Sequence, residues 1–284
     1  MIVPFSNYRI YTLGPEYSFS DLVARKLYPE SEILYMKSNA ELIEKALEGE
    51  IILVPCENTI AGLVEETINK IKGEDIYITK EVLFPVNQCL GGLKDSKEKD
   101  IEIVLSHQKA LEQCKNYLNK NNLCPVETSS TSEAAKAVKD SGKLNYGVIC
   151  SREAITEYGL TLLRENIQDY PDNCTIFWEL SNREKEINEE LPVGTAYMVN
   201  LKNDLGPFRK FFKHIYENDI NVYFLNPWQE NRKTAGEADS PPDLLSYWFL
   251  IKLKAERNKI LGTKLERICD RVKCLGNYNI IDFR

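Results

Sequence analysis

The sequence predicts an α/β protein of two lobes followed by a separate C-terminal unit, and three features support this fold class. Residues 8–160 alternate short β-branched runs with amphipathic stretches, which is typical of βα units around mostly parallel sheets. Residues 181–192 are dense in charge and poor in large apolar side chains, as exposed linkers are. Beyond this linker the expected order of elements changes to βαββαβ. A chain of 284 residues is long enough for two domains.

Four pairs of a strand and a helix make up the first part of the chain. The strands are expected at 8–13, 51–55, 101–106 and 145–151, and the helices at 20–27, 61–71, 107–118 and 152–159. A long β-like run from residue 78 ends in two glycines and a charged loop. We therefore expect the chain to cross between the lobes near 76–90 and to return near 160–172. In such folds ligands bind in the interlobe cleft, at the carboxyl ends of strands.

The C-terminal unit has a different pattern. It predicts strands at 195–201, 220–225, 244–253 and 274–281, helices at 206–218 and 261–272, and a polar loop at 230–243. This βαββαβ order is ferredoxin-like. The expected domains are therefore 1–183 and 190–284.

Charge and composition exclude several classes of protein. A net charge of -7 and a pI near 5.2, without a basic stripe, argue against nucleic-acid binding. No apolar window is long enough for a membrane span, and the N-terminus lacks the pattern of a secretion signal, so we expect a cytoplasmic enzyme or regulator. The eight cysteines form no CxxC motif and only two histidines accompany them, so we expect buried thiols and no metal site. A Cys/His nucleophile pair stays open.

Polar side chains gather at the predicted strand ends and helix starts. Each has a structural alternative, because Ser, Thr and Asn are preferred helix N-caps and a first-turn glutamate favours the helix dipole. Together, hydroxyl, amide and backbone N–H groups at several helix N-termini make a site for carboxylates without Lys or Arg. The residues are Glu57, Asn58, Thr59, Ser106, Gln113, Ser130, Thr131 and Glu133.

Six segments, in order along residues 8–180, carry a family resemblance. They are "LGPEYSFSD", "VPCENTIAG", "LSHQKALEQC", "SSTSEAA", "GVICSREAITEYGL" and "NIQDYPDNCTIF". This set resembles prephenate dehydratase, and the C-terminal unit resembles the ACT regulatory domain that follows it in that family. The resemblance implies a bilobed catalytic domain that converts prephenate to phenylpyruvate, water and carbon dioxide in phenylalanine biosynthesis. It implies no metal and no organic cofactor.

The resemblance also assigns site residues. The family motif N-x-T-R-F falls on residues 173–177, so Thr175 stands where the family has its proton-donating hydroxyl. A threonine hydroxyl assists by a hydrogen bond that strengthens as charge builds on the leaving oxygen. The implied substrate contacts are Asn58, Glu57, Thr59, Ser106, Gln113, Ser130, Thr131, Asn173 and Phe177, with Glu133 nearby.

One departure from the motif leaves three interpretations open. Ile176 stands where the family has an arginine, and losing such a carboxylate contact costs on the order of 2 to 4 kcal/mol. Arg152 and Lys109 are the candidate substitutes, and Tyr17 stands where the family has glycine. The chain is then a dehydratase with a rearranged carboxylate clamp, a prephenate decarboxylase that does not form an aromatic ring, or a catalytically weakened amino-acid sensor. Use of arogenate also stays open.

The C-terminal unit departs from its family as well. The effector positions implied by the resemblance are Gly206, Pro207, Phe208, Asn226 and Trp228. Phe208 and Trp228 would fill the pocket that an effector occupies, which argues against feedback by phenylalanine. The alternative for Trp228 is ordinary packing. We still expect the unit to pair subunits into a homodimer or tetramer, because exposed sheet edges favour association.

Overall fold

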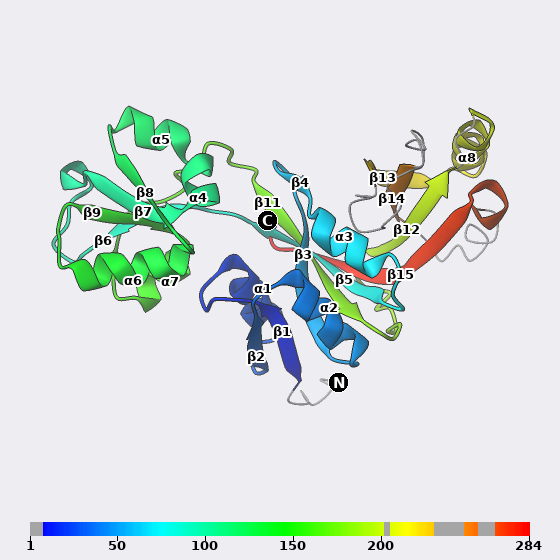
Figure 1. The fold of residues 1–284 in the computed structure, drawn as a ribbon, viewed down its shortest axis with the longest axis horizontal. Helices are drawn as coiled ribbons and strands as arrows, with labels where there is room; N and C mark the ends of the chain where they lie inside the picture. The colour runs from blue at the N-terminus through cyan, green and yellow to red at the C-terminus, as the bar shows by residue number, and fades with distance from the viewer. Residues whose placement is uncertain (1–7, 202–204, 230–246, 255–264) are drawn as a thin grey trace, which may run out of the picture.

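The computed structural model describes residues 8–201, 205–229, 247–254 and 265–284, which form two β-sheets with helices packed against them (Figure 1). The larger sheet contains ten described strands in the order β13-β14-β12-β15-β5-β11-β3-β1-β2, with β4 paired to β3. These strands are β1 (Arg9–Leu13), β2 (Glu32–Met36), β3 (Ile51–Asn58), β4 (Gly62–Leu63), β5 (Tyr77–Pro85), β11 (Cys174–Ser181), β12 (Val193–Leu201), β13 (Asn221–Gln229), β14 (Tyr247–Lys254) and β15 (Arg271–Asp282).

The smaller sheet belongs to a second lobe, at the left of Figure 1. Its order is β10-β6-β9-β7-β8. The strands are β6 (Cys89–Gly92), β7 (Ile103–His107), β8 (Cys124–Thr128), β9 (Tyr146–Cys150) and β10 (Thr161–Arg164). The helices of this lobe are α4 (Gln108–Gln113), α5 (Lys115–Lys120), α6 (Thr131–Ser141) and α7 (Arg152–Glu157), with a short 3-10 turn at Glu98–Asp100.

Helices cover both faces of the larger sheet near its N-terminal strands. Helix α1 (Phe19–Leu27) buries Val23 and Ala24 against Leu53 and Phe177, whereas α2 (Asn39–Leu47) and α3 (Glu65–Ile71) pack on the other face, around Trp178. Helices α1 and α2 begin at serine N-caps, since Ser18 and Ser38 accept backbone hydrogen bonds through their side-chain oxygens. The result is a bilobed α/β architecture.

The strands are parallel only in part, contrary to the expectation of mostly parallel sheets. β1 pairs with β2 and β3 in parallel, and β7 pairs with β8 and β9 in parallel. The strands around the crossings, β5, β11, β6 and β10, are paired antiparallel. A chain that leaves one lobe and returns to it reverses direction, so its outgoing and returning strands run opposite ways.

Two expected helices are also shorter than the pattern indicated. The helix expected at 61–71 begins only at Glu65, because Gly62 has a φ of +81° and belongs to β4. The helix expected at 107–118 is interrupted at Cys114, which is buried and has φ -115° and ψ 20°. Amphipathic periodicity continues through this break, which explains why the sequence does not reveal it.

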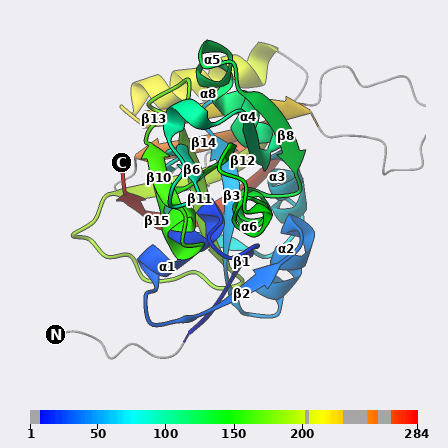
Figure 2. The ribbon, with the colours of Figure 1, turned by 90° about the vertical axis from the view of Figure 1, so that its left-hand side faces the viewer.

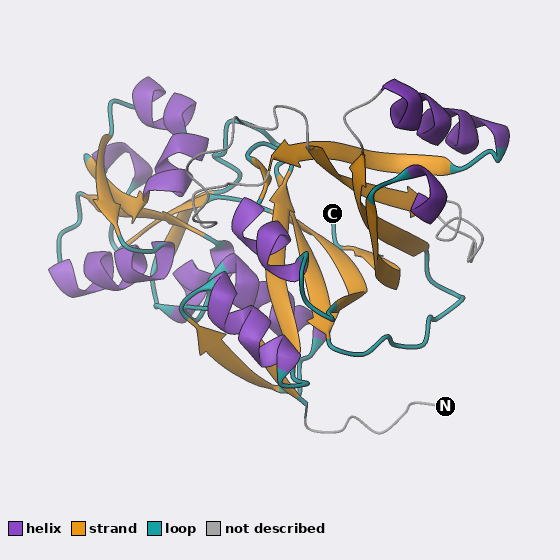
Figure 3. Cartoon of the chain, turned by 45° about the vertical axis from the view of Figure 1, so that its right-hand side comes forward, coloured by secondary structure: helices purple, strands orange, loops and turns teal. Residues whose placement is uncertain are grey.

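The C-terminal unit shares a sheet with the large lobe instead of forming a separate one. Its described elements are β12, α8 (Leu205–Glu217), β13, β14, a helical turn at 265–268 and β15. The four strands have the spatial order β13-β14-β12-β15. Figure 3 shows the strands of the protein in orange and its helices in purple. Strand β15 then continues past β12 and pairs in parallel with β5, from Asn279 opposite Lys80 to Asp282 opposite Leu83. The expected polar loop at 230–243 lies outside the described residues.

One hydrophobic core spans this junction. Met198, Leu250 and Tyr278 of the C-terminal unit are buried in the same cluster as Ile78 and Trp178 of the large lobe. The two units are therefore joined by packing as well as by backbone hydrogen bonds. No helix in the described ranges is both long enough and apolar enough to cross a membrane.

Candidate functional site

The last residue of β3 and the second residue of β11 meet where β3 ends and β11 begins. Asn58 and Thr175 are partners in the ladder, and Asn58 Nδ2 donates hydrogen bonds to Thr175 Oγ1 at 3.1 Å and to Asn173 Oδ1 at 2.8 Å. Asn58 Oδ1 accepts from the backbone N–H groups of Ile60 and Ala61, each at 3.0 Å. Because both ends of the amide are engaged, the orientation of Asn58 is fixed.

Thr59 and Asn173 complete this cluster. Thr59 Oγ1 accepts from the N–H of Cys174 at 3.0 Å, and Thr59 N–H donates to the Cys174 carbonyl at 2.9 Å. Asn173 is 1% exposed, and its buried Nδ2 has no hydrogen-bond partner among the described residues. A buried donor without a protein partner is costly, so this amide is a candidate to bind a water molecule or a ligand.

The cluster lies at the crossings between the lobes. Val86 N–H, just after β5, donates to the Asn173 carbonyl at 2.8 Å. Gln113 is bound from both crossing segments. From the outgoing segment, Gln88 Nε2 donates to Gln113 Oε1 at 3.1 Å. From the returning segment, the N–H of Asp169 donates to the Gln113 backbone carbonyl at 2.7 Å. Gln113 and Asn173 are thus both held against the crossing segments, which run between the lobes in Figure 1.

The small-lobe hydroxyls are mostly engaged in local structure. Ser106 is fully buried and its Oγ donates to the Ile149 carbonyl at 2.6 Å, so it neither caps a helix nor presents a free hydroxyl. Ser130 is the N-cap of α6 and accepts from Glu133 N–H at 3.0 Å. The Glu133 carboxylate accepts hydrogen bonds from the Ser129 hydroxyl and backbone N–H, which lower its pKa. The Glu133 carboxylate is thus used locally, in the first turn of α6 and against the residue before its N-cap, which is the structural alternative for Glu133.

Thr131 follows Ser130 as the first residue of α6 and is partly exposed. In the described part of the chain, no hydrogen bond joins Ser106, Ser130 or Thr131 to Thr175. The structure therefore brings together Asn58, Thr59, Asn173 and Thr175, places Gln113 at the crossing, and leaves the three small-lobe hydroxyls separate from that cluster.

Two expected substrate contacts instead belong to the interior. Phe177 is 1% exposed and packs in the core beside α1. Glu57 lies at a β-bulge: Phe177 pairs with Pro55 and Ile176 pairs with Glu57, so Cys56 is the extra residue. Opposite side chains share a face, so Glu57 points with Ile176 toward the core, where its carboxylate accepts from Lys252 Nζ at 3.0 Å.

Neither candidate substitute for the family arginine lies in the cluster. Ile176 is 6% exposed and packs in the core with Trp178. Arg152 forms an ion pair with Glu165, and Lys109 is exposed at the start of α4. Lys252 was missed by the sequence reasoning, although a lysine in the middle of an apolar strand signals a buried charge.

A loop of the large lobe also contacts the small lobe. Tyr17 has a φ of +62°, and its ring meets the Tyr158 ring edge to face at a centroid distance of 5.7 Å. Ser132 Oγ donates to the Glu16 carbonyl at 2.8 Å. The N-terminal end of α6 is therefore held against the loop before α1. In Figure 2, which looks onto the small lobe, α1 lies below α6.

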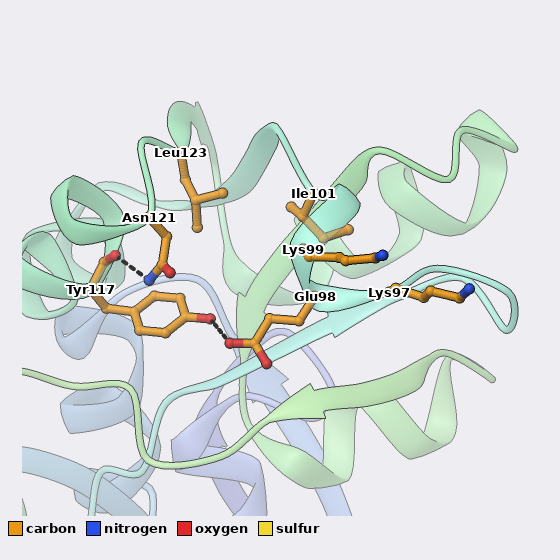
Figure 4. Close-up of a pocket in the computed structure, with 7 residues that line it drawn as sticks. All are labelled: Lys97, Glu98, Lys99, Ile101, Tyr117, Asn121 and Leu123. Carbon is orange, nitrogen blue, oxygen red and sulfur yellow. Dashed lines mark hydrogen bonds between the residues drawn. The ribbon is translucent and has the colours of Figure 1, made fainter.

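A cavity of about 440 Å³ lies in the small lobe and shares no residue with the cluster (Figure 4). The carboxylate in its lining, Glu98, is already engaged, because it accepts from Tyr117 OH at 2.9 Å and pairs with Arg164 at 2.9 Å. In the described ranges no group of three or more His, Cys, Asp or Glu side chains is placed to hold a metal ion.

The fold is a bilobed α/β module, and the cluster gathers hydroxyl and amide side chains at the crossing between the lobes. A family model described as prephenate dehydratase matches residues 10–185. The chain belongs to the prephenate dehydratase family, which confirms the resemblance. The prephenate dehydratase of Lactococcus lactis subsp. lactis (strain IL1403) is 36% identical over 285 residues, covering 96% of this chain and 98% of that protein.

Two further comparisons, with another relative and with a solved structure, agree with this family assignment and with the fold. "Arogenate dehydratase/prephenate dehydratase 1, chloroplastic" of Arabidopsis thaliana is 30% identical over 285 residues, covering 96% of this chain and 72% of that protein. The structure of prephenate dehydratase from Arthrobacter aurescens in complex with L-Phe has a TM-score of 0.80 and 22% identity, covering 95% of this chain and 89% of that one. That likeness confirms the bilobed α/β fold.

Proposed function

We propose that this chain catalyses the conversion of prephenate to phenylpyruvate, carbon dioxide and water in phenylalanine biosynthesis. The observation that carries the proposal is the hydrogen bond from Asn58 Nδ2 to Thr175 Oγ1. Because the oxygen of Thr175 accepts from Asn58, its own O–H proton is directed elsewhere, toward a ligand beside the lobe crossing. Family membership supports the same reaction.

In the proposed reaction the bond between the ring and its carboxylate breaks and releases carbon dioxide. The electron pair of that bond moves into the ring, which becomes aromatic as the opposite C–O bond breaks. The hydroxyl leaves with a proton supplied through Thr175 and forms water, and solvent returns the proton. Aromatisation drives the reaction, so the protein need only orient the dianion and stabilise charge on the departing oxygen.

Neutral donors are proposed to bind the substrate carboxylates. Ile176 leaves β11 without the cation expected from the family motif, and it packs inside the core. Asn173 Nδ2 is a buried donor without a described partner, and Thr131 and the N-terminus of α6 lie on the facing lobe. Hydrogen bonds from neutral groups to a carboxylate are charge-assisted and so stronger than bonds between neutral groups.

Product analysis tests the proposal. Purified protein is incubated with prephenate at neutral pH, and products are followed by phenylpyruvate absorbance in base and by mass. Formation of phenylpyruvate supports the dehydratase. A non-aromatic hydroxyphenylpyruvate-like acid indicates the decarboxylase instead, and ligand-dependent thermal stabilisation without turnover indicates the sensor. Arogenate assayed in parallel decides between the two substrates, since relatives are named for either one.

For residues 190–284 we propose an ACT-like regulatory and dimerisation unit attached to a catalytic domain at 1–183. The βαββαβ order supports it, as does β13, which ends the row of described strands and offers a free edge for pairing subunits. Asn226 and Trp228 lie on β13, and Gly206, Pro207 and Phe208 lie in the first turn of α8. The side chains of Pro207, Phe208 and Trp228 lie outside the described part.

Sedimentation with and without phenylalanine tests this proposal. A homodimer or tetramer supports the pairing, and a monomer at micromolar concentration contradicts it. Absence of any change on adding phenylalanine supports loss of feedback, whereas thermal stabilisation by phenylalanine shows that an effector site is retained. A cytoplasmic location stays a prediction.

A further inference from the structure

Lys252 carries a buried positive charge from the C-terminal unit to the large lobe. It lies in β14, its side chain is 2% exposed, and its Nζ lies 3.0 Å from Glu57 Oε2 and 2.9 Å from Glu81 Oε2. Both carboxylates belong to the large lobe, on β3 and β5. One ammonium group therefore bridges three strands of the larger sheet.

The surroundings of this bridge are fixed by further hydrogen bonds. Glu81 accepts from Trp178 Nε1 at 2.9 Å and from Tyr223 OH at 3.0 Å, and Tyr223 OH lies 2.8 Å from Tyr278 OH. Burial works against the charge on Lys252, but its neighbours, Glu81 first among them, raise its pKa above the usual range. The ammonium form is therefore the one that holds the carboxylates together.

The bridge ends at the β-bulge that precedes Asn58. Cys56, the extra residue, donates through Sγ to the Ile176 carbonyl at 3.2 Å, and Glu57 faces the core opposite Ile176. The next pair is Asn58 and Thr175. A slip of one residue in a strand turns each side chain to the other face of the sheet. The bulge therefore decides whether Asn58 and Thr175 face each other.

We infer that Lys252 is a positioning residue for Thr175. It holds Glu57 on the core face of the bulge and thereby keeps Asn58 opposite the Thr175 hydroxyl. Lys252 itself touches no residue of the Thr175 cluster, so it acts through Glu57 and the backbone of β3. Its kinetic consequence depends on the proposed dehydratase function, whereas its structural consequence, the contact between Asn58 and Thr175, does not.

Three variants test the inference. Lys252→Met leaves the two carboxylates without their shared counter-charge, and Lys252→Arg keeps a cation. Lys80→Met is the matched control, because Lys80 pairs at 2.6 Å with buried Glu179 on β11, away from the bulge. For each variant, kcat and KM for prephenate are measured per mole of folded protein, at a temperature below the unfolding temperature of that variant. A crystal structure of each variant gives the distance between Asn58 Nδ2 and Thr175 Oγ1.

Lys252→Met is expected to lower kcat about tenfold to a hundredfold, as small misplacements of reacting groups do. It should also break the Asn58–Thr175 contact, while Lys252→Arg and Lys80→Met retain most of kcat and the contact. If Lys252→Met does not fold, Glu57→Leu, which leaves the pair between Lys252 and Glu81, should give the same loss. The inference is overturned if the contact survives in Lys252→Met or, failing that, in Glu57→Leu. If the wild-type protein does not turn over prephenate, the proposed function is wrong. The inference on Lys252 is then tested by the Asn58–Thr175 distance in the crystal structures alone.

Discussion

Asn58 and Thr175 are joined by a 3.1 Å hydrogen bond in which the asparagine amide donates to the threonine hydroxyl. The same asparagine accepts from two backbone N–H groups of the following turn, at Ile60 and Ala61. One side chain therefore fixes the end of β3 and the orientation of the hydroxyl on β11. The acceptor side of Thr175 is used inside the protein, and its proton is left for a ligand.

Asn58→Asp separates these two functions of Asn58. A carboxylate still accepts from Ile60 and Ala61, but it cannot donate to Thr175 and it repels the carboxylates of a substrate. We expect kcat/KM for prephenate to fall by about a hundredfold or more, because both orientation and charge are wrong. Steady-state kinetics measures this fall, and urea unfolding serves as control. Unchanged kcat/KM would show that the amide donor is dispensable.

Ile176→Arg tests why an alkyl group occupies this position. The new guanidinium would lie in the core, beside Glu57 and its existing partner Lys252. We expect the free energy of unfolding to fall by about 1 to 3 kcal/mol, because the side chain is larger and two cations compete for one carboxylate. Urea unfolding measures the change.

The double variant Ile176→Arg with Lys252→Met is the control for this interpretation. It removes the competing ammonium, so it should regain part of the stability lost in Ile176→Arg alone. A double-mutant cycle gives the coupling between the two positions. Strictly additive losses would contradict the idea that both side chains compete for Glu57.

Because Glu179 is a buried, ion-paired carboxylate, we expect the free energy of unfolding to depend on pH in the acid range. Burial alone would raise the pKa of Glu179, but Lys80 and Lys185 lower it from an ordinary 4.5 to about 2. A carboxyl with a depressed folded-state pKa stabilises the protein above its unfolded pKa and loses that contribution as pH falls toward its folded pKa. We therefore expect the free energy of unfolding to fall by about 3 kcal/mol between pH ~4.5 and pH ~2.

Urea unfolding at a series of pH values from neutral to about pH 2 measures this step. Glu179→Gln is the matched control, since it cannot titrate and should be less stable at neutral pH but less dependent on pH below 4.5. Equal acid dependence in the two proteins would assign the step to other carboxyl groups.

Much of the site was predictable from strand ends. Asn58 and Thr59 were chosen because polar side chains follow a buried strand, and Thr175 because the family motif falls on it; the structure places the three together. The periodicity missed β2, α2 and β8, but it predicted β1, β3, β5, β7 and β9 and the strands of the C-terminal unit. These features are local, so a single sequence carries them.

The remaining features depend on single-residue register and on distant partners. The bulge at Cys56 turns Glu57 to the core, and no pattern in "VPCENT" announces it. Ser106 looked like a strand-end hydroxyl but bonds inward to Ile149. The sheet shared by β5 and β15 joins residues some 200 positions apart, and local pattern does not show such pairings.

The most direct test of the central claim compares Thr175→Val and Thr175→Ser with wild type in phenylpyruvate formation from prephenate. Valine keeps the shape of threonine and loses the hydroxyl, so kcat should fall about a hundredfold to ten-thousandfold, as when proton transfer is removed. Serine keeps the hydroxyl and should retain most of the rate. Turnover by Thr175→Val at the wild-type rate would contradict the assignment of proton donation to Thr175.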